Sequence, residues 1–232
     1  RLAGLDIVRL VNEPTAAALA YGLGKNAGTV LVFDLGGGTF DASVLQLVGS
    51  EEERFFRVLA TKGNTQLGGD DLDAIVMDHV TALVEDRFGS VTFPPAARQA
   101  LRLFAESARI RLSEEDMATI QLDLDRGRVF QENLTREWFE EKAASVVQKA
   151  VACAKEAVRD AGVDPANIDR VIMVGGTTRT PLVRRLVAEA FQIEPYVALD
   201  PDRVVALGAS VQAAILSGTN PGLLLLLSLI HI

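Results

Sequence analysis

Cysteine and histidine are scarce in this sequence, and basic residues are outnumbered by acidic ones. The single cysteine, Cys153, cannot form an internal disulfide bond, as is usual for a protein of the reducing cytoplasm. The two histidines, His79 and His231, are far apart and do not make a metal site. The net charge of -8 argues against a nucleic-acid-binding surface, since phosphate backbones recruit clustered Lys and Arg.

The sequence also has no initiator methionine and no secretory signal. It begins Arg1-Leu2-Ala3-Gly4, so we expect it to be part of a longer protein. A hydrophobic run from Leu223 is too short to span a bilayer, and no membrane partner is expected. The hydrophobic content of 49% over 232 residues is ample for a packed core in one large domain or two small ones.

What the sequence has is a run of three glycines, Gly36, Gly37 and Gly38, followed by Thr39 and flanked by two aspartates. Apolar or alternating segments on both sides predict two strands, with the glycines in a tight hairpin turn between them. Exposed backbone N–H groups in such a turn favour an anion such as phosphate. Asp34 and Asp41 bracket the turn and could hold Mg²⁺ beside the phosphates. The alternative, an ordinary glycine-rich hairpin with surface aspartates, remains open from these residues alone.

Two other phosphate-binding loops do not fit. A dinucleotide fold needs a third glycine where Asp41 stands, and a helix where a strand follows. A P-loop would need a glycine in place of Leu19 and a hydroxyl residue in place of Asn26.

The remaining pattern alternates strands and helices. We expect strands at residues 5–11 and 55–61, the latter completing a three-stranded antiparallel meander over 30–62. We expect helices at 16–21, 72–88, 96–112, 135–161 and 181–191, a helix opened by Asp200-Pro201 that runs to 217, short strands at 117–124 and 129–133, and a buried strand at 169–174. His79 reads as a structural residue of its helix, and Trp138 and Cys153 as core.

A second glycine pair, Gly175-Gly176, lies between a buried strand and a helix start. That position is the usual ligand site of an open α/β sheet, although a tight strand–helix turn would look the same. The helix-rich segment from Gly68 to about Ala143 reads as a subdomain inserted into the sheet unit, and together with the two glycine sites it favours a cleft that holds a nucleotide.

Five motifs in this order resemble the 70-kDa heat-shock chaperone family (DnaK-type), over residues 1 to about 226. They are Asn12-Glu13-Pro14-Thr15 with the alanines that follow, the segment from Asp34 to Asp41, Leu67-Gly68-Gly69-Asp70-Asp71, the segment from Val174 to Pro181, and Asp200-Pro201-Asp202. The resemblance implies an α/β protein of the actin-like ATPase (ribonuclease H-like) fold, with two lobes around a cleft for ATP or ADP and Mg²⁺.

The resemblance also implies roles for individual residues. Gly36, Gly37, Gly38 and Thr39 would hold phosphates, Asp34 and Asp41 would hold Mg²⁺ through water, and Glu13 would position the attacking water or the metal shell. The catalytic set would be Glu13, Asp34, Thr39 and Asp41. The remaining nucleotide-binding positions would be Gly68, Gly69, Glu106, Arg109, Ile110, Ser113, Gly175, Gly176, Thr177, Arg179 and Asp202.

Two residues depart from the family pattern. Arg109 stands in place of the more usual lysine, which keeps the charge and alters the geometry of the expected ribose contact. Asp200 replaces the commoner asparagine and, with the residues after it, favours the HscA branch, which serves iron–sulfur cluster assembly.

The resemblance divides the chain into parts. Residues 1–23 would end the first lobe, 24–67 and 144–219 would form the sheet-and-helix subdomain of the second lobe, and 68–143 would be a subdomain inserted into it. Residues 220–226 resemble the start of an interdomain linker, and 227–232 match nothing in the family and read as a non-native tail. Because most of the first lobe is missing, we expect the chain to be inactive alone.

The resemblance implies an ATP hydrolase that couples its nucleotide state to the folding of client polypeptides in the cytoplasm. Its partners would be client polypeptides bound by a missing substrate-binding domain, a J-domain co-chaperone and a nucleotide-exchange factor. A sugar kinase or a filament-forming actin relative of the same fold is the alternative.

Overall fold

The computed structural model describes residues 4, 7, 9–22, 28–49, 54–89, 93, 95–124 and 128–217. The strands are β1 (Gly28–Leu35), β2 (Phe40–Gly49), β3 (Arg54–Asn64), β4 (Met117–Leu124), β5 (Arg128–Thr135) and β6 (Arg170–Val174). The helices are α1 (Glu13–Gly22), α2 (Gly69–Phe88), α3 (Pro95–Glu114), α4 (Arg136–Asp160), α5 (Pro181–Phe191) and α6 (Val204–Leu216), with short 3-10 helices η2 (Pro165–Asn167) and η3 (Gly176–Arg179).

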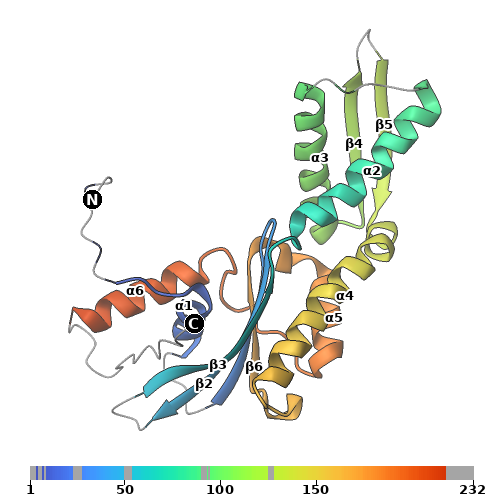
Figure 1. Cartoon of the computed structure of the whole chain (residues 1–232). Coiled ribbons are helices and arrows are strands. Elements are labelled where there is room, and N and C mark those ends of the chain that lie inside the picture. The colour runs from blue at the N-terminus through green and yellow to red at the C-terminus, as the bar shows by residue number, and fades with distance from the viewer. Residues whose placement is uncertain are drawn as a thin grey trace.

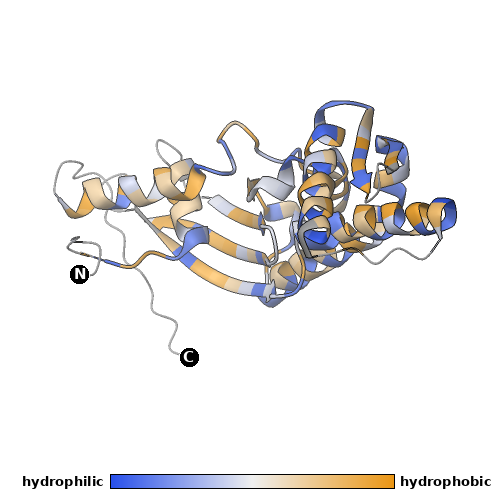
Figure 2. Cartoon of the chain, turned by 90° about the horizontal axis from the view of Figure 1, so that it is seen from above, coloured by the Kyte–Doolittle hydropathy of each residue, from blue (hydrophilic) through white to orange (hydrophobic). Residues whose placement is uncertain are grey.

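A four-stranded sheet in the order β3-β2-β1-β6 forms the centre of the molecule. The first three strands are antiparallel, which confirms the predicted meander, and β6 joins β1 in parallel. Both faces of the sheet are buried. Leu31, Phe33 and Leu35 of β1 belong to a core shared with α4 and α5, whereas Val30 and Val32 face the core under α1 and α6 (Figure 1). Figure 2 shows the resulting long hydrophobic stretches in these strands.

A smaller unit interrupts this sheet-and-helix layer. The chain leaves the sheet after β3, forms α2 and α3 and the β4–β5 hairpin, and returns along the long helix α4 (Figure 1). Thr135 begins α4 as predicted, because its hydroxyl accepts the Trp138 backbone N–H at 3.2 Å. His79 of α2 stacks on Trp138 with ring centroids 4.3 Å apart, consistent with a structural role. Trp138 and Cys153 are only partly buried and pack at the edge of the core.

Two predicted elements differ from the structure. No strand forms at residues 9–11, where Leu10 is 83% exposed and no described strand lies alongside to accept its hydrogen bonds. The last helix begins at Val204 rather than at Asp200-Pro201. The carboxylate of Asp200 instead accepts the Asp202 backbone N–H at 3.0 Å, a local bond that holds a turn in front of the helix.

The expected linker at 220–226 and tail at 227–232, and residues 5, 6 and 8 of the predicted strand at 5–11, lie outside the described residues. Within the described part of the chain, none of the helices combines the length and the apolar character that crossing a membrane requires.

Candidate functional site

The turn between β1 and β2, residues 36–39, is called here the glycine turn. It closes with a hydrogen bond from the Gly36 N–H to the Thr39 carbonyl at 3.0 Å, and Gly37, Gly38 and Thr39 are exposed. Among the described residues, no acceptor receives the N–H groups of these three positions. The turn therefore retains the unpaired backbone donors that an anion site needs.

Two carbonyl groups of the glycine turn are hydrogen-bonded to other parts of the chain. The Gly36 carbonyl accepts the Gly69 N–H at 3.0 Å and the Thr177 hydroxyl at 2.9 Å, and the Gly37 carbonyl accepts the Asp70 N–H at 2.6 Å. In a trans peptide the C=O and the next N–H point in opposite directions, and these peptides are trans. The N–H groups of Gly37 and Gly38 consequently point away from α2, toward the open side of the turn.

Glycines in the first turn of α2 permit this close contact. A side chain on Gly68 would place its first carbon 2.5 Å from the Gly37 carbonyl oxygen. The Gly68 N–H is capped by the Asp71 carboxylate at 2.8 Å. Gly68 and Gly69, which the resemblance places among the nucleotide-binding residues, thus support the glycine turn from behind in this structure.

Three carboxylates gather beside the turn. Asp34 and Asp41 lie opposite each other in the register of β1 and β2. Burial, together with the charges of Glu13 and Asp41, raises the pKa of Asp34 to about 6. Partial burial and the charge of Glu13 raise the pKa of Asp41. The ionised forms of Asp34 and Asp41 are thus destabilised by burial and by neighbouring negative charge, an environment that a divalent cation relieves. No three described His, Cys, Asp or Glu side chains are arranged as a direct metal-binding group.

The second glycine pair meets the first at the end of the sheet. Val174, the last residue of β6, is in register with Asp34, and Gly175 follows with φ of +85°. A side chain on Gly175 would clash with the Leu35 carbonyl and lie 3.0 Å from the Asp34 carboxylate. The two glycine sites, about 140 positions apart in sequence, therefore border the same spot.

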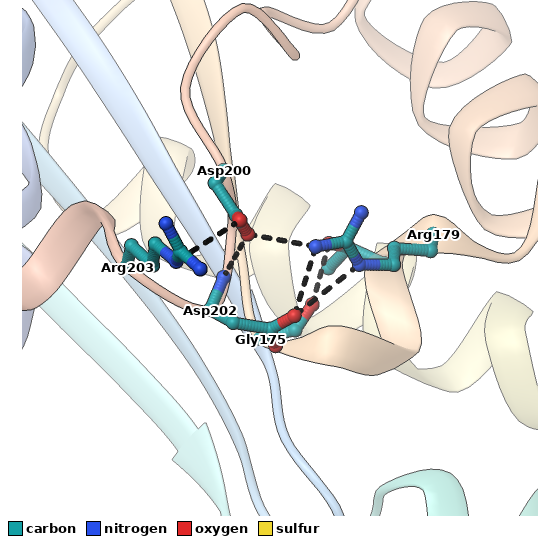
Figure 3. A network of polar contacts seen from close by, with 6 residues as sticks. Gly175, Arg179, Asp200, Asp202 and Arg203 are labelled. Atoms are coloured by element: carbon teal, nitrogen blue, oxygen red, sulfur yellow. Dashed lines mark hydrogen bonds and ion pairs between the residues drawn. The ribbon is translucent and has the colours of Figure 1, made fainter.

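Beyond Gly175, Arg179 is held by two aspartates (Figure 3). Its Nη2 lies 2.7 Å from Asp200 Oδ1 and 2.9 Å from Asp202 Oδ2. The Gly175 N–H donates to the Pro201 carbonyl at 3.2 Å, which fixes the segment after α5 against the end of β6. The guanidinium is thus restrained at the rim of the site while about half of it stays exposed.

Helix α3 carries the other predicted nucleoside contacts. Glu106, Ile110 and Ser113 share one face by their spacing, and Glu106 and Ile110 are exposed. The Ser113 hydroxyl donates to the Arg109 carbonyl in its own helix at 3.0 Å. Arg109 of the same helix is buried, with only 8% of its surface exposed, unlike Glu106 and Ile110. No hydrogen bond or ion pair among the described residues joins this face to Arg179.

The sequence interpretation missed Asp73, the partner of Arg109. The Arg109 Nε donates to Asp73 Oδ1 at 2.6 Å and its Nη2 to Oδ2 at 3.3 Å, and both side chains are more than nine-tenths buried. Burial raises the pKa of Asp73, and the guanidinium opposes that shift. The sequence feature that could have revealed this pair is an acidic residue on the face of α2 that otherwise carries the buried valines at 76, 80 and 84.

Comparison with known proteins gives consistent results. A family model described as Hsp70 protein matches residues 1–229. A chaperone protein HscA homolog of Bordetella petrii is 47% identical over 224 residues, which cover 96% of this chain and 35% of the relative. The corresponding protein of Cupriavidus taiwanensis is 45% identical over 227 residues, covering 96% and 35%. The chaperone protein HscA of Cronobacter sakazakii is 45% identical over 224 residues, covering 95% and 34%. The chain spans about a third of the length of these curated relatives.

Proposed function

This chain belongs to the Hsp70 family, and on that basis we propose that it is the ATP-binding part of a molecular chaperone that couples nucleotide state to the binding of client polypeptides. The observation that carries the proposal is the glycine turn. Its Gly36 and Gly37 carbonyls are bound by α2 and η3, the N–H groups of Gly37 and Gly38 are directed to the open side without an acceptor among the described residues, and two carboxylates with raised pKa lie beside it.

The β- and γ-phosphates of ATP would bind the N–H groups of the glycine turn and the Thr39 hydroxyl. Phosphoryl transfer asks a protein mainly to position the phosphates, the metal and the water, and to stabilise developing charge. Bound Mg²⁺ would supply charge neutralisation at the phosphates. Asp34 and Asp41 would hold its water shell, and Glu13 would orient the attacking water.

The raised pKa of Asp34 and Asp41 supports this assignment. Without a cation, ionisation of these carboxylates is opposed by burial and by the charge of Glu13 and, for Asp34, also by the charge of Asp41. A hydrated cation between the carboxylates and the phosphates would stabilise their ionised forms, which are the forms that accept hydrogen bonds from its waters.

The nucleoside would lie between the exposed face of α3 and the Arg179 network. On one side are Glu106, Ile110 and Ser113, and on the other Gly176, Arg179 and Asp202. A planar guanidinium fixed by two carboxylates presents a flat face suited to stacking on a purine base (Figure 3).

We place the chain mainly in the second lobe of an actin-like ATPase. The sheet with α4, α5 and α6 would be its sheet-and-helix subdomain, residues 68–143 the inserted subdomain, and residues 1–23 the end of the first lobe. The burial of both sheet faces and the separate position of α2, α3, β4 and β5 support this division.

The partners of the whole protein would be client polypeptides, a J-domain co-chaperone and a nucleotide-exchange factor in the cytoplasm. A sugar kinase or a filament-forming protein is the less favoured alternative, since the relatives reported above are chaperones by name.

The test is the longer protein that contains this chain. Purified with ATP and Mg²⁺, it should hydrolyse ATP slowly, and an unfolded client peptide should accelerate turnover. Phosphate transfer to a sugar, or nucleotide-dependent polymerisation without any effect of peptides, would contradict the proposal.

A further inference from the structure

The Asp73–Arg109 pair is the most buried ion pair of the described residues. Asp73 comes from α2 and Arg109 from α3, and their side chains are 7% and 9% exposed. Removing two charges from water is costly, so such a pair is not retained for stability alone. Its two hydrogen bonds instead fix one relative position of the two helices, because a planar guanidinium binds a carboxylate in a defined orientation.

The guanidinium lies directly behind the first turn of α2. A side chain on Gly69 would place its first carbon 3.3 Å from Arg109 Nη2 and 2.7 Å from the Thr177 hydroxyl oxygen. Arg109 and Thr177 thus both lie against the backbone of Gly69, and no side chain separates them from it.

The first turn of α2 and Thr177 act on the same atom. The Gly36 carbonyl oxygen accepts one hydrogen bond from the Gly69 N–H and one from the Thr177 hydroxyl. These donors come from different parts of the chain, one from the unit formed by α2 and α3 and the other from η3 beside Arg179. Two donors on one carbonyl fix its direction, and through the trans peptide they fix the direction of the Gly37 N–H.

We infer that Arg109 and Thr177 are positioning residues for the glycine turn, acting on the Gly36 carbonyl, and that Arg109 is not a nucleoside ligand. The inference rests on the proposed function, since it assumes that the glycine turn binds the phosphates. Arg109 acts through Asp73 and Gly69, and Thr177 acts directly. Arg109 turns its guanidinium toward the carboxylate of Asp73 and retains 8% exposure, so little of it is left for a ribose.

This role makes a distinctive prediction. Misplacement of a binding group by about 1 Å costs on the order of 100-fold in rate. Weakening the hydrogen bonds that orient the Gly36 carbonyl should therefore slow hydrolysis. Binding of adenosine, which involves other residues, should be preserved. A ribose ligand would show the reverse pattern, with weaker nucleoside binding.

The experiment uses the longer ATP-hydrolysing protein and measures two quantities: the single-turnover rate of bound ATP, and the dissociation constant of adenosine. The Arg109→Met change leaves Asp73 without its partner and could prevent folding, so the paired change Asp73→Leu with Arg109→Met replaces both charges by apolar groups of similar size. Thr177→Val removes the hydroxyl and keeps the shape, and Thr177→Ser restores the hydroxyl. Arg102→Gln is the matched control, because Arg102 forms an exposed α2–α3 ion pair with Asp70 at 2.9 Å.

We expect the paired change and Thr177→Val to slow single-turnover hydrolysis by about 10- to 100-fold, with adenosine affinity within about twofold of wild type. Thr177→Ser should recover most of the rate, and Arg102→Gln should leave it unchanged. A wild-type hydrolysis rate in the paired variant, or a tenfold loss of adenosine affinity with normal hydrolysis, would overturn the inference and leave the proposed function standing. Absence of ATP hydrolysis in the wild-type longer protein would overturn both.

Discussion

Asp34 lies directly opposite Asp41 across the first two strands of the sheet, with the charge of Glu13 acting on both. Like charges at facing positions of an antiparallel pair destabilise it. The protein thus places repelling carboxylates beside a turn with unpaired N–H groups, an arrangement that the proposed binding of a cation together with phosphates would explain. The repulsion between these carboxylates should therefore destabilise the nucleotide-free protein.

Replacing Asp34 by asparagine should stabilise the nucleotide-free protein more at high pH than at low pH. The pKa of Asp34 in the folded state, about 6, is above its ordinary value of 3.8, so the folded protein holds this proton more tightly than the unfolded chain does. The resulting contribution of Asp34 to the free energy of unfolding is complete below pH 3.8 and is lost as the pH rises through 6. The neutral amide of the variant avoids that loss. Between about pH 5 and pH 8 the advantage of the variant should grow by roughly 1 kcal/mol, or about 2–4 °C in melting temperature.

Thermal unfolding of the longer protein without nucleotide, at both pH values, measures this difference. Ser43→Ala serves as the control, since it alters the same sheet without a titrating group and should shift the melting temperature equally at both. An advantage of Asp34→Asn that shrinks toward high pH would show that the carboxylate is not strained.

Gly208→Ala should destabilise the protein although alanine favours helices. The first side-chain carbon at position 208 of α6 would lie well inside van der Waals contact of the Ala16 carbonyl on α1. The two helices would have to separate, at a cost of about 1–3 kcal/mol or more. Denaturant unfolding should show this loss, and the exposed Ser210→Ala on the same helix should change stability by less than about 0.5 kcal/mol. Equal stability of Gly208→Ala and wild type would mean that α1 and α6 are not in this contact.

Asp200→Asn should weaken nucleotide binding modestly and in a salt-dependent way. Asparagine can still accept the Asp202 N–H, but the charge that holds Arg179 is halved (Figure 3). Because the pair is exposed, a loss of up to about fivefold in ATP affinity at low salt is expected, shrinking as salt screens the charges. Calorimetric titration at two ionic strengths checks this. Arg203→Gln, which alters a more exposed and longer contact, should have no effect, and a salt-independent affinity of Asp200→Asn would contradict the account.

Glu106→Ala should weaken nucleotide binding by about tenfold, the value of one hydrogen bond to a charged group, without slowing hydrolysis of ATP that is bound. The reason is that Glu106 would touch the nucleoside rather than the reacting phosphate. Titration with ADP and single-turnover hydrolysis separate the two effects, and Ser107→Ala, exposed at the next position, is the neutral control. Slower turnover at saturating ATP would place Glu106 in the chemistry instead.

The glycine turn was predictable because all of its signals are local. Alternating apolar residues on both sides of three glycines predict a hairpin, and the structure confirms it. Long helices were equally predictable, since periodicity and caps such as Thr135 are local as well. Local signals misplaced the start of α6, because the sequence Asp200-Pro201 favours a turn as strongly as a helix cap.

The support of the turn was not predictable from the sequence. The Thr177 hydroxyl reaches Gly36 across 141 positions, and Arg109 reaches Asp73 across 36. Neither partner can be chosen without knowing how α2, α3 and η3 pack. The strand expected at residues 5–11 illustrates the same limit, since a strand depends on a neighbour that the described residues do not supply.

Single-turnover ATP hydrolysis by Asp34→Asn and Thr39→Ala in the longer protein tests the central claim most directly. Both changes remove groups from the site of the reacting phosphate and leave the Arg179 network and α3 intact. The account predicts hydrolysis slowed by about 10- to 1000-fold with nucleotide still bound. Wild-type turnover in both variants would show that the chemistry does not take place at the glycine turn.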